Sequence, residues 1–182
     1  MKKLAIPLLL IFAACGEYNI ESQQDPKADF SQYKTWCWLN NCTPSFDGPD
    51  YIYSKAVLED ITNAIAEEMY NKGYEQGDEN SDLMLNFHVV LKEDSALNSI
   101  VHEEALPLWE HYDESELYYH FLKGTLIIDV ADRELGQIVF RSITERYLPA
   151  HPKVNYSEIK EGINKALEDL PKRTKAVEEE PL

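Results

Sequence analysis

The sequence YYHFLKGTLIIDVADRELGQIVFRSITERYL, residues 118–148, decides the predicted fold. Two runs rich in β-branched and aromatic residues, 118–131 and 137–148, flank the short polar sequence DRELG, which predicts a β-hairpin. Counting from a turn centre near Glu134 places Asp129 roughly opposite Val139, with Arg141 on the diagonal and within reach. Asp129 and Arg141 are therefore predicted to form an ion pair across the hairpin that fixes its register.

A second interpretation of these strand residues is chemical. His88, Asp129, Arg141 and Glu145 all fall in predicted strands and offer an imidazole, two carboxylates and a guanidinium. Such groups on one sheet face can converge as an acid–base or ion-pair cluster. The cross-strand ion pair is the simpler interpretation of the same residues, because the hairpin count already brings Asp129 and Arg141 together.

The segments on either side of the hairpin complete an α+β domain. Residues 54–72 and 157–170 repeat apolar residues at three- and four-residue steps, which predicts two amphipathic helices. Residues 35–39 and 82–91 carry a regular apolar face at two-residue steps, which predicts two further strands. The order β-α-β-β-β-α predicts one sheet of about four mainly antiparallel strands, with both helices on one face.

The predicted single domain covers residues 29–170. One segment inside it and one at each of its ends lack the pattern of a helix or a strand. Residues 92–117 break the strand pattern with acidic residues and Pro107, which predicts an insertion or a long loop. Residues 171–182 are charged and follow the second helix, which predicts a disordered tail. Residues 15–28 are polar and lack periodicity, so they are predicted to be a flexible tether.

The first 14 residues, MKKLAIPLLLIFAA, have the layout of a signal peptide, with an apolar run too short to span a bilayer. The ending before Cys15 resembles a bacterial lipobox, which implies cleavage before Cys15 and attachment of lipid to its thiol. The acyl chains would anchor the protein to a membrane. Gly16 resembles the outer-membrane default, so the expected location is the periplasmic face of that membrane, with surface display as the alternative.

The strongly acidic composition limits the partners of the protein. Without Lys2 and Lys3, 15 basic side chains remain against 33 acidic ones, a formal charge of −18. Nucleic-acid binding depends on basic residues that neutralise phosphates, so no nucleic-acid partner is expected. The expected partners are the membrane, through the lipid anchor, and another envelope protein.

The two remaining cysteines, Cys37 and Cys42, form an even pair once Cys15 carries lipid. The Asn-Asn sequence between them adopts tight turns readily, so the chain can double back and bring the thiols together. An exported protein meets an oxidising compartment, which favours a structural disulfide over free thiols. The spacing does not match the Cys-x-x-Cys redox motif.

Five short sequences, in order, resemble the bacterial lipoproteins of domain-of-unknown-function family 4136. They are DFSQYKTW (29–36), KGY (72–74), DLMLNF (82–87), GTLIID (124–129) and VFR (139–141), and they extend over about residues 28–170. The resemblance implies an anchored periplasmic α+β domain, and the family brings no established activity. Phe140 departs from the tryptophan that usually precedes the arginine in this family, and the 92–117 segment and the two cysteines also depart from it.

No catalytic residue is predicted, and no cofactor beyond the covalent lipid, because the sequence lacks nucleophile, phosphate-binding and His-Glu-x-x-His motifs. His102, Glu103, His111 and His120 are the candidate ligands for zinc or another divalent metal. They support an alternative function, a metal-dependent hydrolase that uses the His/Glu-rich segment 102–120.

Aromatic residues point to binding rather than catalysis. Trp38 and Trp109 are the candidates for a binding surface, because large aromatic side chains are enriched at protein interfaces. The leading prediction is therefore a membrane-anchored envelope lipoprotein that acts as a non-enzymatic binding or accessory module. This function predicts an open sheet face or a groove lined by aromatic residues.

Overall fold

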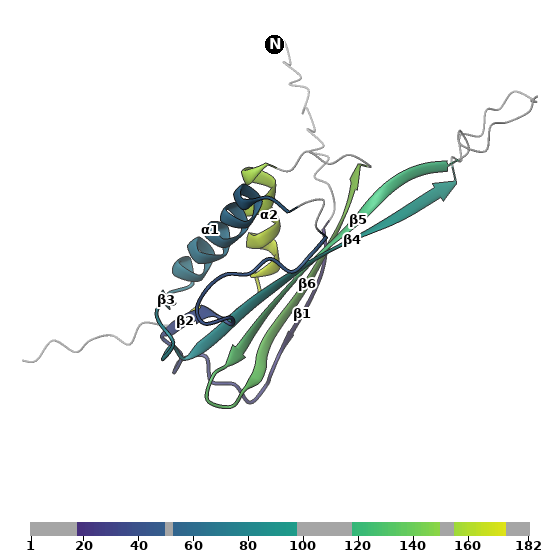
Figure 1. Cartoon of the computed structure of the whole chain (residues 1–182). Coiled ribbons are helices and arrows are strands. Elements are labelled where there is room, and N and C mark those ends of the chain that lie inside the picture. Colours follow the sequence, from purple (N-terminus) through teal and green to yellow (C-terminus); the bar gives the residue numbers. More distant parts are fainter. Residues whose placement is uncertain (1–17, 50–52, 98–117, 150–154, 174–182) are drawn as a thin grey trace, which may run out of the picture.

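The computed structural model describes residues 18–49, 53–97, 118–149 and 155–173. The elements follow in the order β1 (Asn19–Gln24), β2 (Thr35–Trp38), α1 (Lys55–Asn71), β3 (Glu75–Gln76), β4 (Leu83–Leu97), β5 (Tyr118–Asp132), β6 (Gln137–Pro149) and α2 (Tyr156–Ala166). Both helices pack together on one side of a single sheet (Figure 1). Within the described ranges, no helix is long and apolar enough to cross a membrane.

The sheet has the strand order β1-β6-β5-β4-β2-β3. The pairs β1–β6, β6–β5 and β5–β4 are antiparallel, whereas β2 pairs in parallel with both β4 and β3. The predicted α+β class with two helices is confirmed, but the sheet has six strands of mixed direction rather than about four. The sequence does not reveal β3, which has two residues, or β1, which is almost entirely polar.

Strand β1 corrects the predicted start of the domain. Residues 15–28 are predicted to be a tether, yet Asn19–Gln24 pairs along its whole length with β6. The ladder of backbone hydrogen bonds holds this edge strand, so no apolar alternation is needed to place it. As a result, only residues 16–18 separate Cys15 from the sheet.

The predicted hairpin of β5 and β6 is confirmed, but its register differs. Gly136 closes the turn with a φ of 61°, a conformation that glycine adopts without steric cost. A β-bulge then leaves Val139 as an extra residue in β6. Asp129 therefore lies directly opposite Arg141 rather than opposite Val139.

Helix α1 begins and ends where its sequence predicts. The Ser54 hydroxyl accepts a hydrogen bond from the Val57 amide at 3.1 Å, which caps the first turn. Gly73 follows the helix with a φ of 91°, the left-handed conformation that commonly ends a helix. Side chains Ile61, Ile65 and Met69 on one stripe of the helix are buried.

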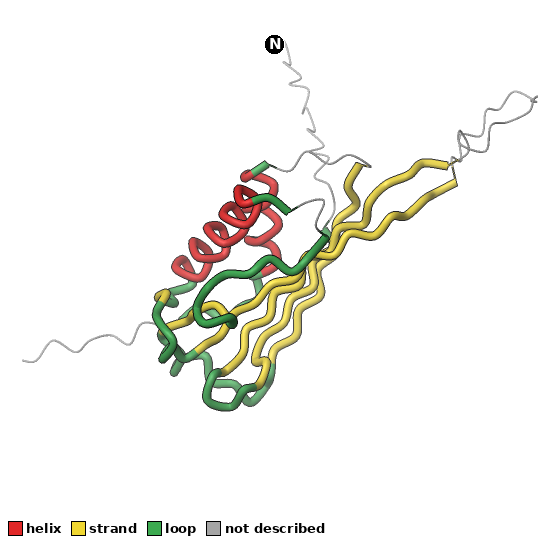
Figure 2. The backbone as a smooth tube through the Cα atoms, viewed as in Figure 1, coloured by secondary structure: helices red, strands yellow, loops and turns green. Residues whose placement is uncertain are grey.

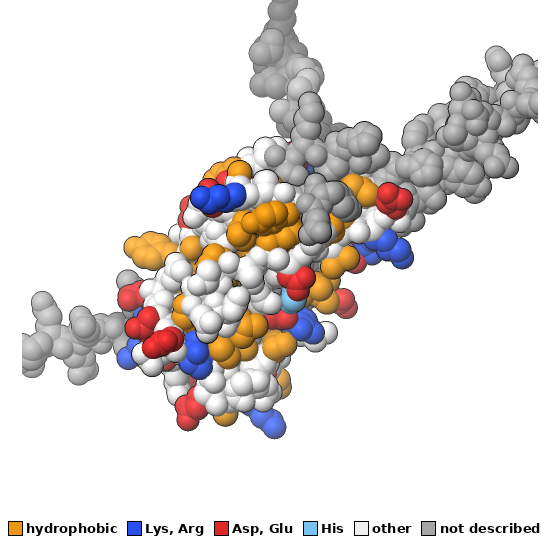
Figure 3. Space-filling view, in the orientation of Figure 1, with side chains coloured by type: hydrophobic (Ala, Val, Ile, Leu, Met, Phe, Trp, Pro, Cys, Tyr) orange, Lys and Arg blue, Asp and Glu red, His pale blue; other side chains and the backbone are white. Residues whose placement is uncertain are grey.

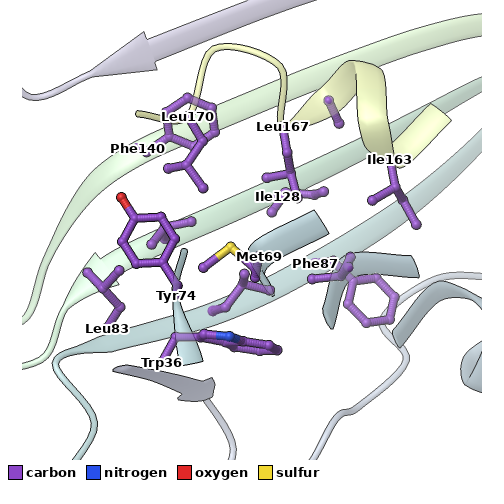
Figure 4. Close-up of a cluster of buried hydrophobic side chains, with 14 of the residues drawn as sticks. Trp36, Met69, Tyr74, Leu83, Phe87, Ile128, Phe140, Ile163, Leu167 and Leu170 are labelled. Atoms are coloured by element: carbon purple, nitrogen blue, oxygen red, sulfur yellow. The ribbon is translucent and has the colours of Figure 1, made fainter. Parts of the chain in front are cut away.

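The hydrophobic core lies between the helices and the sheet (Figure 4). Both layers supply fully buried side chains, among them Trp36, Met69, Tyr74, Phe87, Phe140, Ile163 and Leu167. Trp36 and Trp38 both enter this core from β2, and their rings meet edge to face with centroids 5.1 Å apart. The short strand β2 therefore adds two large aromatic side chains to the core.

Cys37 and Cys42 form the predicted disulfide. The chain reverses through Asn41 and Cys42, whose φ values are 49° and 56°. Arg133 from the β5–β6 turn donates a hydrogen bond to the Cys37 sulfur at 3.0 Å. The disulfide thus closes a small loop at the edge of the sheet and is contacted by the central hairpin.

Candidate functional site

The sheet has two faces with different surroundings, because both helices lie on one side of the strands (Figure 2). The inner face points toward the helices and includes Leu85, Phe87, Ile128, Val130 and Phe140, each at most 1 % exposed. Alternate residues of the same strands point the other way. They make up the outer face, which comprises Asn86, His88, Val90, Ile127, Asp129, Arg141, Ile143 and Glu145 and whose side chains are half-buried or exposed.

A bidentate ion pair lies at the centre of the outer face. Arg141 donates from Nε and Nη2 to the two carboxylate oxygens of Asp129 at 2.6 and 2.8 Å. The hydrogen bonds and charge of Asp129 raise the pKa of the Arg141 guanidinium. The predicted Asp129–Arg141 pair is confirmed, and its parallel hydrogen bonds hold the guanidinium in one orientation.

A second ion pair lies further along the same strands. Lys123 Nζ is 2.8 Å from Glu145 Oε1, and Asn19 of β1 donates to Glu145 Oε2 at 3.1 Å. The hydrogen bond from Lys123, followed by that from Asn19, lowers the pKa of the Glu145 carboxyl. Three strands are therefore linked through one carboxylate on this face.

The predicted acid–base cluster does not form. His88 Nδ1 lies 2.6 Å from Asp47 Oδ2, on the loop beside β4, and His88 Nε2 lies 3.2 Å from the Asn86 amide nitrogen. Asp129 and Glu145 are bound to Arg141 and Lys123 instead. The four predicted residues share one face, but they belong to three separate contacts, so the structural interpretation of the ion pair holds.

Apolar side chains lie among these charged groups. Ile127 of β5 is directly opposite Ile143 of β6, and Val90 of β4 is 48 % exposed. Sequence reasoning misses the two isoleucines, although each lies two residues from a member of the ion pair and therefore shares its face. Apolar side chains bordered by fixed charges are the usual composition of a protein–protein interface.

The predicted metal ligands cannot be brought together from the described part of the chain. His102, Glu103 and His111 lie outside the described residues, and His120 lies in β5 opposite Ser95 of β4. Across the described ranges, no group of three or more His, Cys, Asp or Glu side chains is placed to hold a metal ion. Nothing in those ranges supports the hydrolase alternative, and the metal site stays a prediction.

The predicted aromatic surface needs correction at Trp38. This side chain is 4 % exposed and packs against Phe87, with ring centroids 6.0 Å apart. The reason is the two-residue step of a strand, which places Trp38 on the same side of β2 as Trp36. Trp38 is therefore a core residue and not a binding surface, and Trp109 lies outside the described residues.

These features define a class of protein: a two-layer α+β domain in which one sheet face packs on helices and the other carries fixed ion pairs. The chain belongs to the family described as "Domain of unknown function (DUF4136)", whose model matches residues 20–172. The match confirms the resemblance seen in the sequence, and it begins within β1, in agreement with the corrected domain boundary. No curated protein matches the chain.

Several solved structures are similar to this one. The PelC dodecamer from Paraburkholderia phytofirmans is 12 % identical, with a TM-score of 0.50, over 87 % of this chain and 100 % of that chain. A PDZ domain protein from Parabacteroides distasonis is 13 % identical, with a TM-score of 0.51, over 87 % of this chain and 37 % of that one. A DUF4136 family protein from Bacteroides thetaiotaomicron is 16 % identical, with a TM-score of 0.47, over 83 % and 94 %. At such identities the first two likenesses show a shared fold.

Proposed function

We propose that this protein is a lipid-anchored envelope protein that acts as a non-enzymatic binding module. Cys15 carries the anchor, the periplasmic leaflet of the outer membrane is its location, and the outer face binds another envelope protein. The observation that carries the proposal is the outer face itself. It combines apolar side chains with two fixed ion pairs on the side of the sheet away from both helices.

The geometry of the outer face suits recognition of a protein. Because Asp129 already holds the Arg141 guanidinium, less side-chain freedom is lost when a partner carboxylate or carbonyl approaches it. The Ile127–Ile143 pair supplies apolar area that a partner can remove from water. The hydrogen-bonded strands beneath keep both features at fixed positions, which lowers the cost of binding further.

The identity of the partner follows from the size of a cross-linked product. A photoreactive amino acid at Ile143, or at Ile127, is irradiated in cells that make the anchored protein. Discrete adducts are expected from both positions, and their masses identify the partner. An adduct of twice the mass of the chain would identify a second copy of the chain as the partner.

The matched control carries the same amino acid at Asn63, which is exposed on α1 on the other side of the molecule. No discrete adduct is expected from that position. Adducts of equal strength from Asn63 and Ile143, or none from Ile143 and Ile127, would contradict the proposal.

The anchor has its own test. Cells fed labelled palmitate should transfer label to the protein, and Cys15→Ser should remove both the label and the membrane association. Label that persists in the Cys15→Ser variant would place the lipid elsewhere and contradict this part of the proposal.

A further inference from the structure

An apolar groove opens on the inner side of the sheet, where the first turns of both helices meet the strands. Its volume is about 180 Å³. Side chains from both helices and three strands line it, among them Val57, Ile61, Leu126, Thr144, Ile159 and Ile163. On the face displayed in Figure 3, hydrophobic side chains reach the surface between the helices and the strands.

Tyr18 fixes one rim of this groove. Its hydroxyl accepts a hydrogen bond from Arg146 Nη1 at 3.1 Å, and the Arg146 guanidinium carbon lies 5.2 Å from the centre of the tyrosine ring. Arg146 also lies 3.8 Å from Glu158 at the start of α2. Tyr18 is therefore held beside the groove by Arg146 of β6, which itself contacts α2.

The chain length from Tyr18 back to Cys15 limits where the anchor can be. Three residues span at most about 10 Å between Cα atoms, even when the chain is fully extended. A lipid on Cys15 would therefore be attached to the chain within about 10 Å of the Tyr18 backbone, beside the groove. An acyl chain attached there has a very high effective concentration at the groove compared with any lipid that must diffuse to it.

We infer that the groove receives the first part of one acyl chain of the lipid on Cys15, an inference that rests on the proposed anchor. A cavity of about 150 Å³ takes up one benzene molecule, so this groove has room for a stretch of about six carbons. The remaining acyl chains stay in the membrane, where two are enough for stable anchoring.

One buried polar group in the groove, the Thr144 hydroxyl, fits the head of such a chain. Thr144 is 4 % exposed, and its hydroxyl oxygen has no hydrogen-bond partner among the described residues. The ester or amide carbonyl that begins an acyl chain can accept a hydrogen bond from this hydroxyl, while the methylenes that follow contact the apolar walls. The bound chain would hold the groove end of the domain against the membrane, with the outer face turned to the side.

The experiment uses the full anchored protein made in cells that are fed a fatty acid with a diazirine near its carboxyl end. After irradiation, the protein is purified from membranes and its peptides are mapped by mass spectrometry. We expect the Cys15 peptide to be joined through the fatty acid to peptides that contain Val57 and Ile61, or Ile159 and Ile163.

A variant that fills the groove provides the sharper readout. Gly162 lines the groove, and a Cβ atom added there would lie 3.7 Å from the Tyr18 ring, an ordinary contact distance. Gly162→Leu should fold, because leucine favours helices more than glycine does, and it should abolish the cross-links between Cys15 and the groove. Asn164→Leu places the same side chain on an exposed position of α2 outside the groove and should leave the cross-links unchanged.

The outcomes separate this inference from the proposed function. Label on Cys15 without cross-links to groove peptides would overturn the groove assignment and leave the anchor standing. Cross-links from the groove to free phospholipid instead of Cys15 would also overturn it, because the occupant would then be a membrane lipid. Loss of label from Cys15 in the unaltered protein would overturn both.

Discussion

The inner and outer faces of the sheet are built from the same strands, yet they differ in what they contact. On β4, the neighbours Phe87 and His88 show the difference, since Phe87 is fully buried against the aromatic core and His88 is half-exposed beside Asp47. The inner face is apolar and stabilises the fold through burial. The outer face carries fixed ion pairs and exposed aliphatic side chains, which contribute little to the stability of the fold. This difference between the two faces is the reason why we propose the outer face as the surface that contacts another molecule.

The largest expected effect on stability comes from comparing substitutions of two neighbouring residues of β4, one on each face of the sheet. Phe87→Ala removes a buried ring that packs against Trp38 and should lower the free energy of unfolding by about 3–5 kcal/mol. His88→Ala, one residue away on the outer face, should change it by less than about 1 kcal/mol. Urea unfolding followed by tryptophan fluorescence measures both, since Trp36 and Trp38 are buried. Similar losses for the two variants would show that the outer face is part of the folding core.

The next effect concerns the disulfide at the edge of the sheet. Replacing Cys37 and Cys42 together by alanine opens a loop with a sequence separation of five residues. The free energy of unfolding should fall by about 2 kcal/mol, the loop-closure entropy that the disulfide removes from the unfolded chain. The same unfolding measurement, with and without a thiol reductant, checks this value. A reductant should lower the stability of the unaltered protein and leave the double variant unchanged.

Asp82 directly precedes β4, and its contribution to the free energy of unfolding depends on pH. Burial by itself would raise the pKa of this carboxyl, but hydrogen bonds from the Thr35 and Lys34 amides, at 2.9 and 2.7 Å, outweigh it and lower the pKa below 3.8. The unfolded state then binds protons more readily, so this contribution is present at neutral pH and is lost as the pH falls through the lowered pKa.

Asp82→Asn should therefore lower the free energy of unfolding by about 1 kcal/mol at pH 7. In acid, the free energies of unfolding of the variant and the unaltered protein should become more similar. Unfolding curves between pH 7 and acid conditions measure this convergence. Glu79→Gln, at an exposed position in the same turn, should show no such dependence. A difference that grows as the pH falls would contradict the assigned direction of the pKa shift.

The smallest effect is the contribution of the central ion pair to stability. A double-mutant cycle with Asp129→Asn and Arg141→Gln should give a coupling free energy of about 0.5–1 kcal/mol, because the arginine is partly exposed to water. The coupling should decrease in 1 M salt, where screening acts over about 3 Å. A much larger coupling that is insensitive to salt would mean that the pair stabilises the fold rather than a binding surface.

The sequence predicts most of the inner layer and part of the outer face. Apolar spacing defines α1, with Ser54 and Gly73 at its ends, and the hairpin count brings Asp129 and Arg141 together. The exact register could not be predicted, because the β-bulge, which leaves both Val139 and Phe140 buried, has no signal in the local sequence.

The polar edge strand β1 could not be predicted either, because its sequence carries no strand pattern. Strand β1 has no apolar alternation, since only its backbone pairs with β6, so its residues resemble a tether. The burial of Trp38, by contrast, follows from the two-residue step of a strand, which places it on the same side of β2 as the buried Trp36. The β5–β6 part of the outer face could be recognised from the predicted hairpin, whereas the parts from β4 and β1 could not, because the position of these two strands in the sheet was not known.

The central claim is that the outer face binds a partner, and Ile143→Lys tests it most directly. Ile143 lies opposite Glu21 of β1 and two residues from Glu145, so a lysine there meets carboxylates and the fold should be retained. The measurement is the yield of adduct from the photoreactive amino acid at Ile127, with and without Ile143→Lys, in protein shown to be folded by its thermal unfolding curve. The account predicts that the adduct is lost while the unfolding curve is little changed. An adduct of undiminished yield from the folded variant would contradict it.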